Sequence, residues 1–142
     1  MYNAIKNFNK QFEYQPKIEN SKNLKKKFSK FIIAGMGGSN LVANLLRVRD
    51  PQLDIIIHKN YGLPIISKKE LHGRLLIVNS YSGNTEETLD SFSKALTQKI
   101  PMVTIATGGK LIALAKKHNL PYIQMPSTGI QPRAALGLNI KA

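Results

Sequence analysis

Cysteine is absent from the 142 residues of this chain, so disulfide bonds, thiolate nucleophiles and zinc sites with cysteine ligands are excluded. The three histidines, His58, His72 and His118, lack the spacing of metal ligands, and we expect no metal site. No apolar run is long enough to span a bilayer, and the N-terminus lacks the apolar stretch of a signal peptide. We therefore expect a cytoplasmic protein with no membrane partner, which the absence of cysteine also fits.

Acidic residues are scarce as well, since 8 aspartates and glutamates stand against 21 lysines and arginines, for a formal net charge of +13. The excess is densest in the first 30 residues, around Lys22, Lys25, Lys26, Lys27 and Lys30. A basic run can bind nucleic acid, but it more often forms a solvated face, and we expect no nucleic-acid partner. A diffuse positive field also steers anionic metabolites toward a protein.

Five short apolar runs alternate with helical patterns along the chain. They predict β-strands at Phe31–Ala34, Leu53–Ile57, Leu75–Val78, Met102–Ala106 and Pro121–Met125. This alternation predicts a three-layer α/β fold with a five-stranded parallel sheet covered on both faces. We favour the flavodoxin-like order 2-1-3-4-5, which places the loops after the first and third strands side by side at the carboxyl edge.

Residues 1–30 form a separate basic segment in this prediction, and residues 31–142 form the sheet domain. In the first segment, Tyr2–Tyr14 has the pattern of an amphipathic helix with Ile5, Phe8 and Phe12 on one stripe, and Ser21–Lys30 is a candidate surface helix. Further helices are predicted through Leu41, Leu45 and Leu46, after Thr85, from Lys110 to His118, and from Pro132 onward.

A hydroxyl-rich turn follows the third predicted strand. It holds three hydroxyl groups and a glycine that permits a tight turn, at Ser80, Ser82, Thr85 and Gly83. Thr85 is a predicted helix N-cap, and the acidic residues Glu86 and Glu87 suit the first helical turn. Hydroxyls and free backbone N–H groups at a helix start favour a bound phosphate, and the alternative is a capped turn without a ligand.

A glycine-rich turn, Gly35–Ser39, follows the first predicted strand. It departs from a dinucleotide fingerprint because position 40 is asparagine, and no Gly-Lys-Ser/Thr of a Walker loop follows. We therefore expect no nucleotide cofactor. Its glycines would let a ligand approach the backbone and Ser39 could donate a hydroxyl, although packing alone also explains such a turn. Thr107–Lys110 is either a third ligand-facing loop or a plain turn.

Arg133 follows Pro132 at the carboxyl edge of this predicted sheet. Its planar guanidinium suits an oxyanion or the oxygen of an enolate. A lone arginine is otherwise a surface residue.

Four segments in this order resemble one family: Gly35–Ser39, Ser80–Leu89, Gly108–Leu111 and Gln131–Gly137. Together they are similar to the N-terminal half of a bifunctional phosphoglucose/phosphomannose isomerase, which is built on the sugar isomerase (SIS) domain. The resemblance runs from about Phe31 to Gly137.

The resemblance implies a phosphosugar site without a cofactor. Ser80, Ser82 and Thr85 would hold the phosphate, and the sugar would lie beside Gly37, Gly38 and Ser39. Arg133 would stabilise an enediolate intermediate. In this family the reaction interconverts glucose 6-phosphate or mannose 6-phosphate with fructose 6-phosphate, a step of glycolysis and gluconeogenesis, and we expect a homodimer of the full-length form.

The chain departs from the family in length, because family members carry two SIS domains. Their general base, a glutamate, and their ring-opening histidine come from beyond the point where this chain stops. We therefore expect a truncated SIS domain without the second one, able to bind substrate and inactive alone. Asn40 and Ala43 also stand where the family usually has Ala and Gly. Two alternatives remain, a non-catalytic sugar-phosphate sensor and a single-SIS isomerase completed by a neighbouring subunit.

Overall fold

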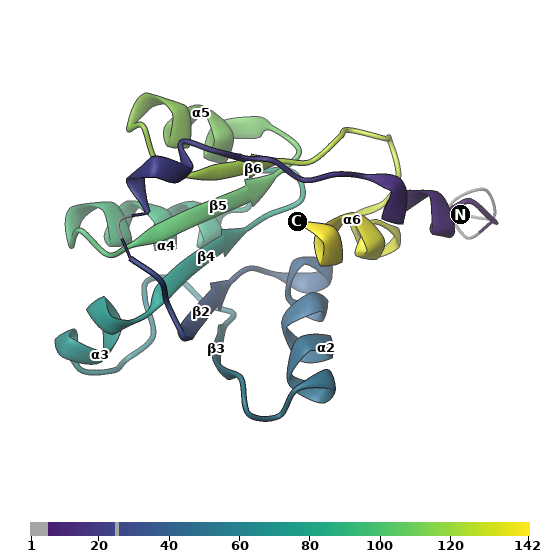
Figure 1. Ribbon diagram of the computed structural model, residues 1–142. Helices are drawn as coiled ribbons and strands as arrows, with labels where there is room; N and C mark the ends of the chain where they lie inside the picture. The colour runs from purple at the N-terminus through teal and green to yellow at the C-terminus, as the bar shows by residue number, and fades with distance from the viewer. Residues whose placement is uncertain (1–5, 25) are drawn as a thin grey trace.

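The computed structural model describes residues 6–24 and 26–142, and it is built on a six-stranded sheet (Figure 1). The strands lie in the spatial order β1-β6-β5-β4-β2-β3. Their bounds are Ile18–Glu19 (β1), Lys30–Ala34 (β2), Asp54–His58 (β3), Leu75–Asn79 (β4), Met102–Ala106 (β5) and Tyr122–Gln124 (β6). Strands β2 to β6 run parallel to one another, and β1 pairs with β6 in the antiparallel direction.

The predicted α/β class is confirmed, but the prediction of five exclusively parallel strands is wrong. The sixth strand, β1, lies in the segment that was predicted to be separate from the sheet, and it pairs Ile18 with Ile123 and Glu19 with Tyr122. A two-residue strand carries no readable alternation of apolar and polar residues. Its conformation is decided by the free edge of β6, which supplies the backbone hydrogen-bonding partners.

Five α-helices and four 3₁₀ turns connect the strands in the described residues. The α-helices are Leu41–Arg49 (α2), Lys68–Gly73 (α3), Glu86–Thr97 (α4), Gly109–Lys117 (α5) and Leu136–Lys141 (α6). The 3₁₀ turns are Phe8–Glu13 (η1), Ser21–Asn23 (η2), Gly37–Asn40 (η3) and Pro132–Ala134 (η4). None of the helices in the described part of the chain combines the length and the hydrophobicity that crossing a bilayer requires.

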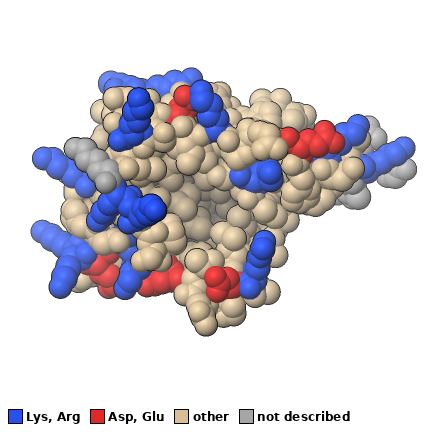
Figure 2. All heavy atoms as spheres, in the orientation of Figure 1, with Lys and Arg blue, Asp and Glu red and all other residues tan. Residues whose placement is uncertain are grey.

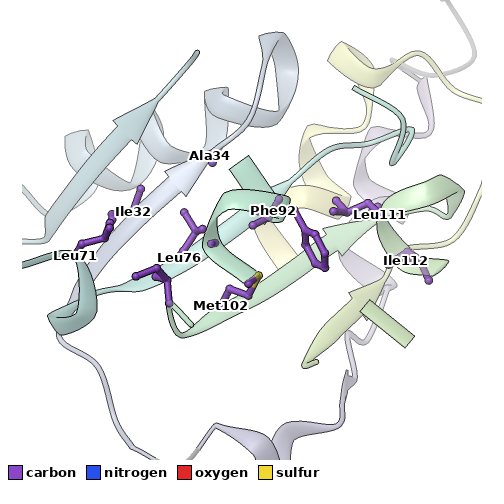
Figure 3. Close-up of a cluster of buried hydrophobic side chains, with 12 residues drawn as sticks. Ile32, Ala34, Leu71, Leu76, Phe92, Met102, Leu111 and Ile112 are labelled. Carbon is purple, nitrogen blue, oxygen red and sulfur yellow. The ribbon is translucent and has the colours of Figure 1, made fainter. Parts of the chain in front are cut away.

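One face of the sheet packs against α3, α4 and α5 (Figure 3). Alternate strand residues such as Ile32, Leu76 and Met102 point to this face, as expected for the two-residue period of a strand. Phe92 of α4 and Leu111 of α5 meet them and are 1% and 0% exposed. Burial of these side chains holds α4, and with it the loop that precedes α4, against the sheet.

The opposite face packs against the C-terminal helix and the N-terminal segment. Ile105 and Ile123 point to this face and form a cluster with Ala135 and Leu138, against which Tyr14 packs. In Figure 1, α6 lies beside α2 and beside the N-terminal η1 segment, and residue contacts join both pairs. Segments from the two ends of the chain thus cover the same side of the sheet.

The N-terminal segment differs from the predicted amphipathic helix. The described part of Tyr2–Tyr14 forms the 3₁₀ turn η1, while Tyr2 to Ile5 and Lys25 lie outside the described residues. A 3₁₀ helix has three residues per turn, whereas an α-helix has 3.6. Phe8, Gln11 and Tyr14 therefore face inward, and Phe12 is 43% exposed. The surface helix predicted over Ser21–Lys30 is also wrong, because among the described residues of this range η2 is the only helical turn and Lys30 already belongs to β2.

Arg74, just before β4, is a buried cation, with 4% of its side chain exposed. Its guanidinium donates hydrogen bonds to the carboxylates of Asp54 and Glu70, the latter at 2.8 Å. The bond from Arg74 is the largest cause that lowers the pKa of Asp54, and the same bond raises the pKa of Arg74. The ion pairs join the start of β3 to α3.

Candidate functional site

Two loops meet at the carboxyl edge of the sheet, because β2 and β4 are neighbouring parallel strands. Residues 35–40 follow β2, and residues 80–85 follow β4. Ser39 joins the loops: its Oγ accepts a hydrogen bond from the backbone N–H of Tyr81 at 3.2 Å, and its carbonyl oxygen accepts one from Asn79 Nδ2 at 3.0 Å. These bonds fix the position of the glycine-rich turn relative to the hydroxyl-rich loop.

The hydroxyl groups of residues 80–85 lie at two depths. Ser80 is 1% exposed, and its Oγ lies 2.9 Å from Thr85 Oγ1 and accepts a bond from the Gly83 N–H at 3.1 Å. Ser82 is exposed, and its Oγ accepts a bond from the Asn84 N–H at 3.2 Å. Ser80 therefore supports Thr85 from beneath, while Ser82 and Thr85 are available at the surface.

Thr85 is the N-cap residue of α4, as predicted, but its hydroxyl bonds to Ser80 and caps no backbone N–H. The Thr85 side chain therefore leaves the first-turn N–H groups available, at the positive end of a 12-residue helix. Glu86 is held by Tyr61, whose phenol donates to Glu86 Oε2 at 3.2 Å. Desolvation and then this bond raise the pKa of Tyr61, so the phenol stays a donor.

The 3₁₀ turn η4 approaches these loops from the C-terminal part of the chain. It packs directly on Gly38 of η3: a Cβ at that position would lie 3.2 Å from the carbonyl oxygen of Pro132 and 3.3 Å from the backbone of Arg133. A side chain at position 38 would push the turn away. The glycine therefore serves close packing and brings Arg133 over the edge of the sheet.

Together the three segments line one open pocket with a volume of about 610 Å³. This volume suits a small metabolite. The pocket is lined by Met36, Gly37, Gly38, Ser39, Tyr81, Ser82, Thr85, Gln131, Pro132, Arg133 and Ala134. Six of the seven residues predicted for the site are in this lining, and the seventh, Ser80, lies directly below Thr85.

Arg133 carries the only charge among these lining residues. Its side chain is exposed, and within the described part of the chain it makes no ion pair and no hydrogen bond. An unpaired guanidinium beside hydroxyl groups and helix N–H groups is suited to an anion. On the face shown in Figure 2, basic side chains lie around the periphery and do not gather in one patch.

The lining contains no carboxylate and no imidazole among the residues that the structure describes. No group of three or more metal-ligating side chains is found in that part of the chain either. The pocket can therefore bind and polarise an anionic ligand. Its described lining holds neither of the side-chain types that most often transfer protons in enzymes, a carboxylate or an imidazole.

The Thr107–Lys110 loop lies outside this lining. It packs against the hydroxyl-rich loop, since Asn84 Oδ1 accepts a bond from the Lys110 N–H at 3.0 Å and a side chain at Gly83 (φ +71°) would collide with the carbonyl of Gly108. These contacts are those of a turn that packs against a neighbouring loop, which is one of the two interpretations given for Thr107–Lys110. Five further lining residues were not predicted, although each lies within two positions of a predicted one: Met36, Tyr81, Gln131, Pro132 and Ala134.

The fold is that of sugar isomerase domains. The sugar isomerase domain of the RpiR transcription factor from Sphaerobacter thermophilus superposes with a TM-score of 0.60 at 16% identity, covering 97% of this chain and 82% of that one. The NanR protein of Vibrio vulnificus, complexed with ManNAc-6P, gives a TM-score of 0.57 at 16% identity, covering 97% and 55%.

Sequence comparison narrows this class to a family. The bifunctional phosphoglucose/phosphomannose isomerase of Caldicellulosiruptor bescii is 39% identical over 141 residues, which cover 96% of this chain and 40% of the relative. The chain therefore belongs to the family of bifunctional phosphoglucose/phosphomannose isomerases along the length that it shares with them, and it spans about two-fifths of that relative. No family model matches the chain.

Proposed function

We propose that the pocket binds a sugar 6-phosphate. Ser82, Thr85 and the N–H groups at the start of α4 hold the phosphate, with Ser80 fixing the Thr85 hydroxyl from below. The sugar lies beside Gly37, Gly38 and Ser39, where the backbone is accessible. Charge-assisted hydrogen bonds of about 1.5–3 kcal/mol each anchor the phosphate, and this binding energy positions the reacting carbons.

Arg133 stabilises the enediolate that forms when a proton moves between C1 and C2 of the sugar. The observation that carries this proposal is the guanidinium itself, which is the only charge in the lining and has no partner among the described residues. An oxyanion generated during the reaction would therefore meet a cation that no carboxylate of the described chain neutralises.

The proposed reaction of the whole protein is the interconversion of glucose 6-phosphate or mannose 6-phosphate with fructose 6-phosphate, in glycolysis and gluconeogenesis. The described pocket lining has no carboxylate or imidazole for the base or for ring opening, so we assign both roles to groups outside this lining. We further propose that residues 31–142 form the SIS domain and residues 1–30 an N-terminal segment that adds β1 and the first residue of β2 to its sheet. The full-length form is proposed to be a cytoplasmic homodimer.

Isothermal titration of this chain with glucose 6-phosphate, fructose 6-phosphate and unphosphorylated glucose tests the proposal. We expect both sugar phosphates to bind and glucose to show no measurable heat, because the phosphate supplies the anchoring bonds. An assay for conversion of glucose 6-phosphate is expected to detect no turnover by the chain alone. Absence of sugar-phosphate binding would refute the proposed site, and robust turnover would refute the need for groups beyond it.

The absence of a carboxylate or imidazole from the described pocket lining also favours a second candidate, a sugar-phosphate sensor without catalysis. The NanR protein of Vibrio vulnificus, which was solved in complex with ManNAc-6P, shares the fold of this chain. The two candidates differ in one measurement: an enediolate-like ligand binds more tightly than fructose 6-phosphate in an isomerase site, whereas a sensor has no reason to prefer it. A single-SIS isomerase completed by a neighbouring subunit would instead show turnover that rises with oligomer formation.

A further inference from the structure

A buried glutamine from the N-terminal segment contacts the turn that carries Arg133. Gln11 is 7% exposed, although it lies on a 3₁₀ turn whose neighbours are mostly exposed. Its Nε2 donates to the carbonyl oxygen of Ala134 at 2.7 Å, and its Oε1 accepts from the backbone N–H of Leu138 at 3.2 Å. These bonds join residues 123 and 127 positions apart in the sequence.

The two bonds fall on either side of the junction between η4 and α6. Ala134 is the last residue of η4, and the Leu138 N–H belongs to the first turn of α6, where the helix has no acceptor of its own for it. The N-cap residue of α6, Ala135, has no side chain that caps the helix. Gln11 supplies the missing cap from a distant segment and at the same time holds the preceding carbonyl.

The packing around Gln11 is built for this contact. A Cβ at Gly137 would lie 2.8 Å from Gln11 Cβ and 3.0 Å from Gln11 Oε1, so the bare glycine backbone is what lets the carboxamide reach both partners. Gln11 is not among the residues that line the substrate pocket, whereas its partner Ala134 is. It can therefore act on the site only through the backbone of the turn.

We propose that Gln11 is a positioning residue for Arg133, an inference that rests on the proposed function. The Arg133 side chain has no hydrogen-bond or ion-pair partner in the described chain, so the backbone of η4 sets the point from which the guanidinium reaches the pocket. That backbone is held by the Gly38 contact on one side and by the Gln11 carboxamide on the other. Loss of the carboxamide would release the turn on one side and displace the cation from the developing oxyanion.

Two anions separate positioning from general structural support. A phosphorylated hydroxamate that mimics the enediolate would contact both Arg133 and the hydroxyl-rich loop, and inorganic phosphate would contact only the loop. We expect Gln11→Ala to weaken hydroxamate binding about tenfold and to change phosphate binding less than twofold. Asn9→Ala, an exposed change on the same 3₁₀ turn, is the matched control and should alter neither.

A double-mutant cycle tests whether Gln11 acts through Arg133. In an Arg133→Ala background, Gln11→Ala should cause no further loss of hydroxamate affinity. Equal losses for both anions, no loss for either, or additive losses in the cycle would each overturn the proposal. If Gln11→Ala does not fold, Gln11→Glu is measured in the same way. It retains the acceptor for the Leu138 N–H but loses the donor to the Ala134 carbonyl, so the same selective loss is expected.

Amide hydrogen exchange gives a readout that needs no ligand. Gln11→Ala should increase exchange at the Leu138 N–H and leave the α4 amides unchanged. Unchanged protection at Leu138 would show that the Gln11 side chain does not hold the junction of η4 and α6. A wild-type chain that binds neither anion would refute the proposed function and with it the role of Gln11 toward Arg133. The exchange result still decides whether Gln11 holds the junction of η4 and α6. Failure of the proposed function and failure of the Gln11 proposal are therefore distinguishable.

Discussion

Removing the two surface hydroxyls of the residue 80–85 loop should weaken sugar-phosphate binding while leaving the fold intact. The change is Ser82→Ala with Thr85→Ala. Two charge-assisted bonds of at least about 1.5 kcal/mol each are lost, or about 3 kcal/mol together. Since about 1.4 kcal/mol corresponds to a factor of ten, the Kd for glucose 6-phosphate should rise about 100-fold or more. The α4 N–H groups remain, so weak binding should persist.

The structure also indicates what the double change costs in stability. Ser80 loses the Thr85 hydroxyl but keeps the Gly83 N–H at 3.1 Å, so its buried oxygen retains a partner. Loss of one such bond lowers the free energy of unfolding by about 1 kcal/mol.

Titration calorimetry gives the affinity, and urea denaturation gives the stability. The matched control is Ser93→Ala, which removes an exposed hydroxyl from α4 far along the same helix. An affinity within threefold of wild type, in a variant that still unfolds cooperatively, would refute the assignment of this loop to the phosphate.

Three further changes test other parts of the structure. Arg133→Lys, which keeps the charge but loses the planar fork, should weaken an enediolate mimic about tenfold in calorimetry and leave inorganic phosphate unaffected. Gly38→Ala places a Cβ 3.2 Å from the Pro132 carbonyl and should produce the same selective loss, at little cost in stability. Arg74→Ala removes the buried cation from Glu70 and leaves Asp54 with Lys30 alone, and it should lower the free energy of unfolding in urea by about 2 kcal/mol. Because the folded pKa of Asp54 lies below its ordinary value of 3.8, the stability from this pair is present above that pH and is lost as the pH falls through the folded pKa.

Each of these three has a contradicting result. If Arg133→Lys weakened binding of the enediolate mimic and of inorganic phosphate equally, Arg133 would contact the phosphate group and not the enediolate. Unchanged binding in Gly38→Ala would show that the η4 turn tolerates displacement. A free energy of unfolding in urea that is the same in Arg74→Ala and wild type would show that the Arg74 ion pairs do not stabilise the fold.

Much of the sheet was predictable because its central strands are buried on both faces. Leu75–Val78 is an uninterrupted apolar segment, Met102–Ala106 is apolar except for Thr104, and the observed strands match both runs to within a residue. The helix α3 was missed although Ser67 caps it, accepting a bond from the Glu70 N–H at 3.2 Å in the pattern of a capping box. That signal was readable, but the helix is only six residues long and its apolar stripe is short.

The N-terminal segment was predicted poorly for a different reason. Its aromatic spacing fits an α-helix, but the chain adopts a 3₁₀ turn because Gln11 and Tyr14 find their partners on residues more than 100 positions away. The strand β1 likewise exists only because β6 offers a free edge. Local propensity contains no information about such distant partners.

For the site, the sequence alone determined which residue types were available: a hydroxyl-rich loop, a glycine turn and one arginine, each following an element whose pattern is local. Only the tertiary structure decided that they share a pocket, since this depends on the pairing of β2 with β4 and on the packing of η4 over Gly38. It also decided that Ser80 supports the loop from below and that Gln11 reaches the turn of Arg133. The physical reason is that hydrogen bonds and close contacts between segments far apart in the chain form only when the whole sheet brings the segments together.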